Sequence, residues 1–287
     1  MNDQARNLRK RMETSRNDKK ARTIAVISGK GGVGKSNIAL NFSLELVNRK
    51  KRTILFDLDI GMGNINILLG LQPKRTIVDL FNDRLSIFDI IEEGPGNLHY
   101  IAGGSGLNNF VQLSDRTKEH FYEQYQKLEN MYDYIIFDMG AGINEDSLSF
   151  ILAADECIVV TTGEPTSFTD AYSIIKQIVS HGGNMPLFAI INRAKSNNDL
   201  TTLKRFQQVV KQFLNINIQP LGIIPDDKHV NEAVMRQIPY LLLDKRAPAA
   251  KSIQQLADNY LNSLEEIHLS YKPAFIERLK SIIRGKF

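Results

Sequence analysis

Short runs of apolar, β-branched residues alternate along the chain with longer segments whose apolar positions recur at helical spacing. The short runs predict strands at Thr23–Ser28, Thr53–Asp57, Asn97–Ile101, Tyr134–Asp138, Glu156–Thr162, Leu187–Asn192 and Gln219–Ile224. The longer segments predict amphipathic helices, among them Asn37–Arg49, Arg116–Met131, Ser167–His181 and Leu200–Leu214. Strands that are apolar on both faces need helices on both sides. The pattern therefore predicts an α/β three-layer sandwich around a mainly parallel sheet of seven to eight strands.

Composition limits the kinds of core, redox environment and membrane association that fit this sequence. The 287 residues are 43% hydrophobic, which is enough for one large core. A single cysteine, Cys157, excludes a disulfide framework or a thiolate metal site supplied by one chain, and it favours a reducing, cytoplasmic environment. No run approaches the roughly 18 to 20 apolar residues of a membrane-spanning helix, and the polar N-terminus lacks the apolar core of a signal peptide.

The net charge of +4 is concentrated at the two ends. Residues 1–22 carry eight Lys or Arg against three Asp or Glu, and residues 272–287 carry five against one, so the body between them is mildly acidic. A Gly- and Asn-rich stretch from Ala102 to Asp115 is expected to be a surface loop. We therefore divide the chain into a basic segment 1–22, a body 23–270 and a terminal helix 271–287.

A phosphate-binding loop follows the first predicted strand and opens the first predicted helix. Its glycines let backbone N–H groups fold around phosphate oxygens, Lys35 can reach the terminal phosphates, and the Ser36 hydroxyl can ligate Mg²⁺. A plain glycine-rich turn does not require the Lys-Ser ending in this context. The predicted nucleotide-binding residues here are Gly29, Lys30, Gly31, Gly32, Val33, Gly34, Lys35, Ser36 and Asn37.

Lys30, a second lysine inside this loop, is the signature of deviant Walker ATPases, and with it the sequence resembles the MinD/ParA family over about residues 23–270. This resemblance implies a P-loop fold of the SIMIBI type. The segment Ile54–Asn64 resembles the Asp-x-Asp-x-Gly switch of that family, with Asp57 and Asn64 as switch residues. By resemblance, Asp59 orients the attacking water and supports the Mg²⁺ shell, which makes it catalytic together with Lys30 and Lys35.

Tyr132–Gly142 resembles a Walker B strand and its following switch. Asp138 would hold Mg²⁺ through water, and Gly140 and Gly142 would form the second switch. The chain departs from the family at Met139-Gly140, where Ser/Thr-Pro is usual, and at Asn37, where a second hydroxyl is usual. These departures leave nucleotide binding intact but put the details of the second switch in question.

Two later strand ends resemble the adenine-contacting positions of the family, and the predicted residues are Asn192, Arg193, Pro225 and Asp226. An asparagine at a strand end is more often a turn residue, so this assignment depends on the resemblance. Together the matches imply an ATPase that uses Mg²⁺ and forms a homodimer around two ATP molecules. Lys30 would then reach the phosphates of the partner subunit, and hydrolysis would release the dimer.

The last residues form an apolar stripe with a basic surround, as in a helix that lies in a membrane interface. The predicted membrane residues are Phe275, Ile276, Leu279, Ile282 and Ile283, with Arg278 and Lys280 beside them. The alternative is an ordinary terminal helix docked on the body. The resemblance to MinD, which has a membrane-targeting terminal helix, implies reversible binding to an anionic membrane in the ATP-bound state. Docking in one nucleotide state and release in the other would reconcile both interpretations.

The N-terminal segment Asp3-Gln-Ala-Arg-Asn-Leu-Arg9 resembles the activator motif of the FlhG (YlxH/FleN) family of flagellar number regulators. In that family the segment stimulates the GTPase FlhF. The resemblance assigns GTPase activation to Asp3, Gln4, Leu8 and Arg9, and it makes flagellar basal-body proteins candidate partners. The alternative from the residues alone is a basic solvated tail.

Other function classes fit the sequence less well. A ParA-type partition ATPase needs a surface that neutralises DNA phosphates, and the acidic body argues against DNA as a partner. A MinD-type regulator of the division site remains an alternative. A metabolic enzyme such as dethiobiotin synthetase would need a substrate pocket, for which no signature is visible. A nitrogenase-type iron protein needs two ligating cysteines per subunit, and this chain has one.

Overall fold

The computed structural model describes residues 20–59, 64–82, 85–104, 110–195, 198–266 and 273–285. The activator residues Asp3, Gln4, Leu8 and Arg9 lie outside these ranges, so their assignment stays a prediction.

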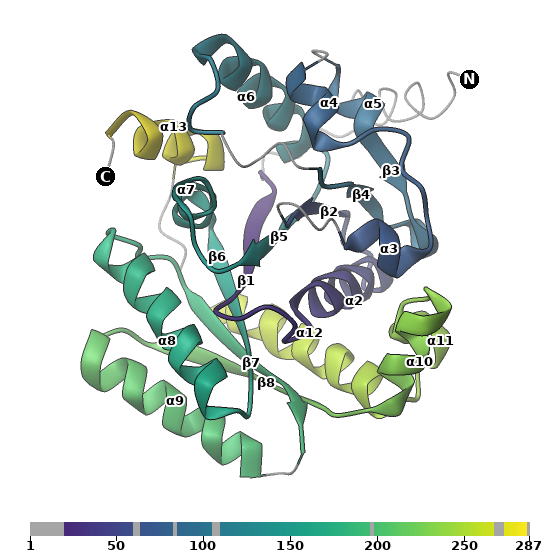
Figure 1. The fold of residues 1–287 in the computed structure, drawn as a ribbon, viewed down its shortest axis with the longest axis vertical. Coiled ribbons are helices and arrows are strands. Elements are labelled where there is room, and N and C mark those ends of the chain that lie inside the picture. The colour runs from purple at the N-terminus through teal and green to yellow at the C-terminus, as the bar shows by residue number, and fades with distance from the viewer. Residues whose placement is uncertain are drawn as a thin grey trace.

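The described strands form one eight-stranded sheet in the order β3-β4-β2-β5-β1-β6-β7-β8 (Figure 1). Their bounds are β1 Arg22–Ser28, β2 Thr53–Leu58, β3 Ile91–Glu93, β4 His99–Ile101, β5 Tyr134–Ala141, β6 Glu156–Thr162, β7 Leu187–Ala194 and β8 Ile218–Pro225. All neighbours pair in parallel except β3 and β4. The expected fold class, a mainly parallel α/β sheet, is confirmed.

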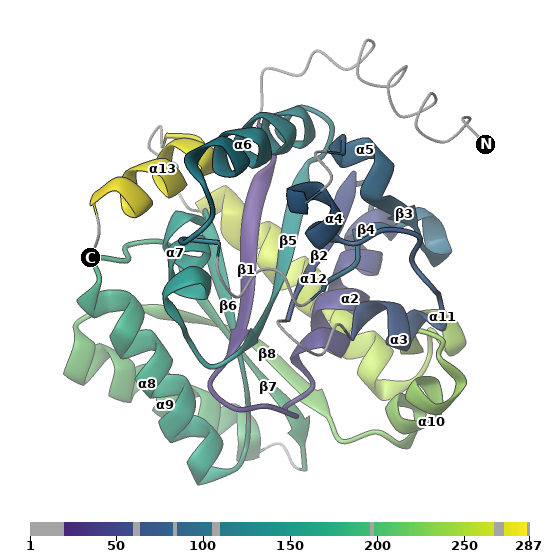
Figure 2. The same ribbon diagram turned by 45° about the horizontal axis from the view of Figure 1, so that its top comes forward.

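Successive side chains of each central strand enter different cores, because a strand alternates its faces. In β5, Ile135 and Phe137 enter one core, whereas Tyr134 and Ile136 enter the other. The first core is covered by α4 Ile77–Asn82, α5 Ile87–Ile90, α6 Asp115–Glu129, α7 Glu145–Ala153, α8 Pro165–Ser180, α9 Asn198–Leu214 and α13 Phe275–Gly285. The second is covered by α2 Lys35–Asn48, α3 Ile65–Leu69, α10 Lys228–Arg236, α11 Tyr240–Leu243 and α12 Pro248–Glu266 (Figure 2). This is the predicted three-layer arrangement.

The terminal helix α13 is docked on the body, against α6 and α7. Phe275, Ile276 and Leu279 are buried. The centre of the Phe275 ring lies 4.7 Å from the centre of the Tyr125 ring and 5.3 Å from that of the Phe137 ring. The apolar stripe predicted to face a membrane therefore faces the protein interior in this state. Among the described residues, no helix is long and apolar enough to cross a membrane.

The basic residues of α13 also contact the body. Arg278 donates hydrogen bonds to the Ala153 carbonyl at 2.7 Å and to the Asp155 carboxylate at 2.6 Å. Lys280 donates to Glu119 at 2.8 Å and lies 4.7 Å from the centre of the Tyr122 ring. These contacts show a specific seat for α13, since both its apolar and its basic side chains are matched.

A candidate nucleotide-binding site

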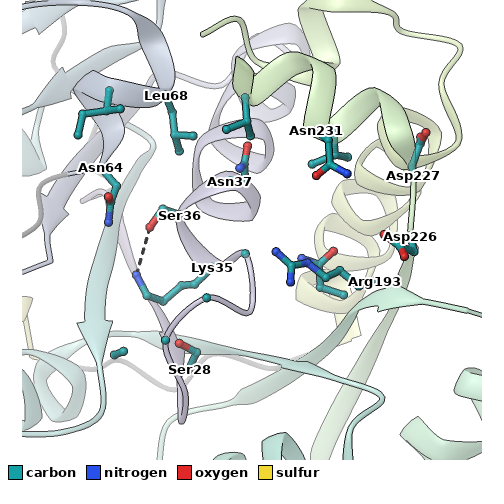
Figure 3. A pocket seen from close by; sticks show the side chains of 18 of the residues that line it. Ser28, Lys35, Ser36, Asn37, Asn64, Leu68, Arg193, Asp226, Asp227 and Asn231 are labelled. Carbon is teal, nitrogen blue, oxygen red and sulfur yellow. Dashed lines mark hydrogen bonds between the residues drawn. The ribbon is translucent and has the colours of Figure 1, made fainter. Parts of the chain in front are cut away.

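A cavity of about 650 Å³ opens at the carboxyl ends of the central strands (Figure 3). The chain leaves β1 toward β2 on one side and returns to β6 on the other, and parallel sheets bind ligands at such a reversal of strand order. The predicted residues that line the cavity are Gly31, Gly32, Gly34, Lys35, Ser36, Asn37, Asp59, Asn64, Asn192, Arg193, Pro225 and Asp226. The structure thus brings together residues from four distant parts of the sequence.

The loop between β1 and α2 has a backbone that only glycine adopts readily. Gly32 and Gly34 have φ angles of 78° and 91°. Asn192 donates from Nδ2 to the Val33 carbonyl at 2.8 Å, and a methyl group added at Gly34 would lie 2.3 Å from that Nδ2 atom. Asn192 therefore holds the phosphate loop through the Val33 carbonyl, a role that its predicted contact with adenine did not include.

Replacing Gly34 by alanine is expected to weaken ADP binding tenfold or more. The positive φ costs about 1–3 kcal/mol for a residue with a side chain, and the added methyl group also displaces Asn192. Calorimetric titration with ADP measures the effect. Gly32→Ala is the matched control, because Gly32 also has a positive φ but a methyl group there meets nothing within 4 Å. Equal losses in both variants would contradict the role given to Asn192.

The first turn of α2 provides the positive end of the site. Gly34 caps the helix without a side-chain hydrogen bond, so the helix amides are available to an anion. The Lys35 ammonium is buried, 2.5 Å from Asp138 Oδ1 and 3.5 Å from the Ser36 hydroxyl. The other Asp138 oxygen is buried and has no hydrogen-bond partner in the described part of the chain.

Two further carboxylates stand beside this pair. Asp57 accepts hydrogen bonds from the N–H groups of Asp59 at 3.1 Å and Ile65 at 3.0 Å. Burial, with the neighbouring Asp138 carboxylate, raises the pKa of Asp57 to about 7. Burial also raises the pKa of Asp59, whose carboxylate accepts from Asn64 Nδ2 at 3.2 Å. Asp57 thus anchors the switch backbone, whereas Asp59 reaches the cavity.

Ser36, Asp138 and Asp59 fit a Mg²⁺ ion, which prefers oxygen ligands and keeps several of its waters. The unpartnered Asp138 oxygen and the excess of carboxylates beside one lysine support this assignment. A bound Mg²⁺ would neutralise phosphate charge during phosphoryl transfer. In the second switch, Ala141 lines the cavity, whereas Gly142 donates its N–H to the Ser28 carbonyl at 3.2 Å.

Lys30 lies outside its own cavity. Its ammonium is 3.6 Å from the Glu164 carboxylate, and both side chains are largely exposed. Gly29 and Val33 do not line the cavity either; a methyl group at Gly29 would lie 2.3 Å from the backbone of Asp170 in α8. The loop thus presents Lys30 at the protein surface, beside Glu164 and outside the cavity.

Sequence reasoning missed one wall of the cavity. It is formed by α3 and α10, through Ile67, Leu68, Val230, Asn231, Val234 and Met235. The apolar spacing of Val230, Ala233 and Val234 directly after the predicted base-contact strand was the signal that could have identified α10.

Comparison with known proteins agrees with this geometry. Residues 24–240 match the family described as the CobQ/CobB/MinD/ParA nucleotide binding domain. The chain is 34% identical to the antiactivator FleN of Pseudomonas aeruginosa, covering 89% of this chain and 92% of that protein. It is 31% identical to the flagellum site-determining protein YlxH of Helicobacter pylori, and this match covers 89% of this chain and 88% of that protein. The septum site-determining protein MinD of Pyrococcus horikoshii, solved with Mg-ADP, is 25% identical to this chain. The two structures superpose with a TM-score of 0.70, and the match covers 88% of this chain and 100% of that one.

Proposed function

Because the chain belongs to the CobQ/CobB/MinD/ParA family of nucleotide-binding proteins, we propose that it is an ATP-driven switch that regulates the number or placement of flagella. It is an ATPase that uses ATP, ADP and Mg²⁺. The observation that carries the proposal is the cavity in which the phosphate loop, Lys35 and Asp59 converge, with Lys35 paired to the buried Asp138 beside it. The flagellar role is supported by its similarity to FleN and YlxH over most of their lengths.

Each protein group has a defined task in this reaction. Loop amides and Lys35 hold the phosphates, and Asp59 orients the attacking water by accepting its hydrogen bond. Asn64 fixes the Asp59 carboxylate by donating to it. Asp57 holds the start of α3 through the Ile65 N–H, so a change at the phosphates is passed to that helix.

Dimerisation completes the site. The outward position of Lys30 supports a contact with the phosphates of a partner subunit, because its ammonium does not reach its own cavity. Added positive charge in trans would stabilise the charge that develops during phosphoryl transfer. ATP therefore joins two subunits, and hydrolysis separates them.

The docked helix α13, which we call the latch, couples this cycle of ATP binding and hydrolysis to the membrane. Asp138 is followed by the second switch and then by α7, on which α13 is docked. Movement of α7 when ATP joins two subunits weakens the seat of α13 and releases its apolar face to an anionic membrane. One such helix binds weakly, but two on one dimer gain about 10² in avidity. Association with the membrane is then reversible and depends on ATP.

Removing the two ion-pair partners of α13 is expected to increase membrane binding with ADP about fivefold. The double variant Glu119→Gln, Asp155→Asn weakens docking by about 1 kcal/mol without altering the helix itself. The measurement is co-sedimentation with anionic liposomes in ADP and ATP. Glu232→Gln, which removes an exposed ion pair on α10, is the control. The coupling of α13 to the membrane would be refuted by two results together. The double variant and the wild type would sediment equally with liposomes in ADP, and ATP would not change the sedimentation of the wild type.

The N-terminal segment supplies the link to a second switch protein. We assign GTPase activation to Asp3, Gln4, Leu8 and Arg9, with FlhF as the partner and flagellar basal-body proteins as further partners. The full chain is expected to accelerate GTP hydrolysis by FlhF, and Gln4→Ala should lose acceleration more than binding, because the glutamine helps position water. Phosphate release and pull-down measure the two effects. A full chain without any stimulation returns this segment to the status of a basic tail.

A further inference from the structure

The docked helix α13 is joined to the first residues of β1 through Asp155. One oxygen of the Asp155 carboxylate accepts a hydrogen bond from the Arg278 guanidinium at 2.6 Å, and the other accepts from the Thr23 N–H at 2.8 Å. The Asp155 N–H in turn donates to the Thr23 carbonyl at 2.9 Å. The backbone of Thr23 is therefore held by a carboxylate that Arg278 keeps in place.

Tyr125 of α6 makes a second link between α13 and the same residue. Its hydroxyl lies 2.8 Å from the Thr23 hydroxyl, and both side chains are fully buried. The centre of the Tyr125 ring lies 4.7 Å from the centre of the Phe275 ring of α13. Figure 2 shows α6 and α13 at the end of the sheet where β1 begins. Thr23 is thus linked to α13 twice, once through a charged group and once through an aromatic ring.

Three carboxylates lie around this end of β1, and each has a basic partner. The pairs are Lys20–Glu129, Arg22–Glu156 and Arg278–Asp155. Burial, with the nearby Asp155 carboxylate as a smaller cause, raises the pKa of both Glu129 and Glu156. When Arg278 leaves, Asp155 is unpaired beside two other carboxylates. Repulsion then favours a turn of Asp155 toward water, away from the Thr23 N–H.

The residues held in this way also join the N-terminal segment to the body. The described chain begins at Lys20. The Ala21 N–H donates to the Glu129 carbonyl at 2.8 Å, and the Arg22 N–H donates to the Asp133 carbonyl at 2.9 Å. The residues assigned to GTPase activation precede Lys20 in the sequence. The contacts of α13 therefore act where the N-terminal segment enters the fold.

We propose that α13 controls how firmly the N-terminal segment is attached to the body. While α13 is docked, Asp155 and Tyr125 fix the start of β1. When α13 moves to the membrane, both links are lost, the start of β1 loosens, and the segment reaches further toward a GTPase. GTPase activation is thereby favoured at the membrane. The inference rests on the proposed function, which supplies the release of α13 and the activator role of the segment.

The link also works in the opposite direction, because coupling between two binding events is reciprocal. A protein that draws the residues before Thr23 away from the body weakens the docking of α13. Such a protein therefore increases membrane binding by this chain.

The first test measures hydrogen exchange at backbone amides of the full chain with ADP and without lipid. Arg278→Gln is expected to speed exchange in α13 and to speed it about tenfold at the Thr23 amide, which loses a charge-assisted hydrogen bond. Arg284→Gln is the matched control, because it removes a basic side chain of α13 that lies 3.9 Å from Glu119 and not at Asp155. Unchanged exchange at Thr23 in Arg278→Gln overturns the inference, whether or not α13 itself exchanges faster.

The second test starts from the other side of the same contacts. Thr23→Val removes the hydroxyl that bonds to Tyr125, and it is expected to increase co-sedimentation with phosphatidylglycerol liposomes in ADP about threefold. Thr53→Val is the matched control, since Thr53 is buried at the start of β2 and its hydroxyl donates to the Lys51 carbonyl. Equal increases in both variants would overturn the inference, because any lost hydroxyl in the sheet would then suffice.

The third test measures GTP hydrolysis by FlhF, the GTPase of the proposed function. Without liposomes, Arg278→Gln is expected to stimulate hydrolysis at a concentration about threefold lower than wild type, and Arg284→Gln at the wild-type concentration. Faster exchange at Thr23 without this gain overturns the control of activation by α13. A wild-type chain that never stimulates FlhF overturns the activator role alone, because the exchange and sedimentation tests contain no GTPase. Wild type that binds liposomes with neither nucleotide overturns the membrane cycle, while the exchange test, which contains no lipid, still decides whether α13 holds the start of β1.

Discussion

Replacing Lys35 by alanine is expected to lower ADP affinity roughly 10- to 100-fold, whereas Lys30→Ala leaves ADP affinity nearly unchanged and weakens the ATP dimer. A charge-assisted hydrogen bond to phosphate contributes about 1.5–3 kcal/mol, and Lys35 provides it from within the cavity. The Lys30 ammonium instead lies 3.6 Å from the exposed Glu164 carboxylate, outside the cavity. Calorimetry with ADP and sedimentation with AMPPNP measure the two effects.

The Lys35 experiment needs a control for folding. Lys35→Ala leaves the buried Asp138 carboxylate without its cation, next to Asp57. The double variant Lys35→Ala, Asp138→Asn removes that unpaired charge, so it should recover thermal stability without recovering ADP affinity. Recovery of both would mean that Lys35 acts mainly on the fold. Equal loss of ADP affinity in Lys30→Ala and Lys35→Ala would contradict a role for Lys30 in trans.

Asp59→Ala is expected to reduce ATP turnover about 10²-fold or more while retaining the ATP-bound dimer. The reason is that a positioned carboxylate contributes about 10²–10⁴ when it orients a reacting water. Phosphate release and sedimentation with ATP measure turnover and dimer together. Asn64→Ala should show a smaller loss, because Asn64 only fixes the Asp59 carboxylate. Asn66→Ala, two residues further along the chain in α3, is the matched control. Wild-type turnover in Asp59→Ala would remove Asp59 from the mechanism.

The central strands and long helices could be predicted because their signal is local. Thr53–Asp57 and Leu187–Asn192 fall within β2 and β7, which extend one and two residues further. The predicted strand at Asn97–Ile101 begins two residues early, because Pro95–Asn97 forms a 3₁₀ turn. β3 was not predicted, since three residues are too few to show alternation and its antiparallel pairing with β4 is a tertiary contact.

The same distinction applies to the site. The phosphate loop and both switch strands are contiguous motifs, so their residues could be assigned from sequence. The α3–α10 wall depends on the hydrogen bond between Gln237 and Ile67, which are 170 residues apart, and no local pattern encodes that contact. Likewise, the spacing in Phe275–Ile283 predicts an amphipathic helix, but the aromatic rings that receive Phe275 come from α6 and β5.

The proposed release of α13 would require one set of side chains to suit two different environments. Phe275, Ile276 and Leu279 are packed in the protein interior, and in the proposed cycle the same side chains must also fit a lipid interface. An interior demands defined shapes, whereas a bilayer demands only apolar character. Exchanges among apolar residues of different shape should therefore disturb the docked state and spare lipid binding, so they bias the protein toward the membrane. Deleting the helix instead would uncover the rings of Tyr125 and Phe137, and the shortened chain would become prone to self-association.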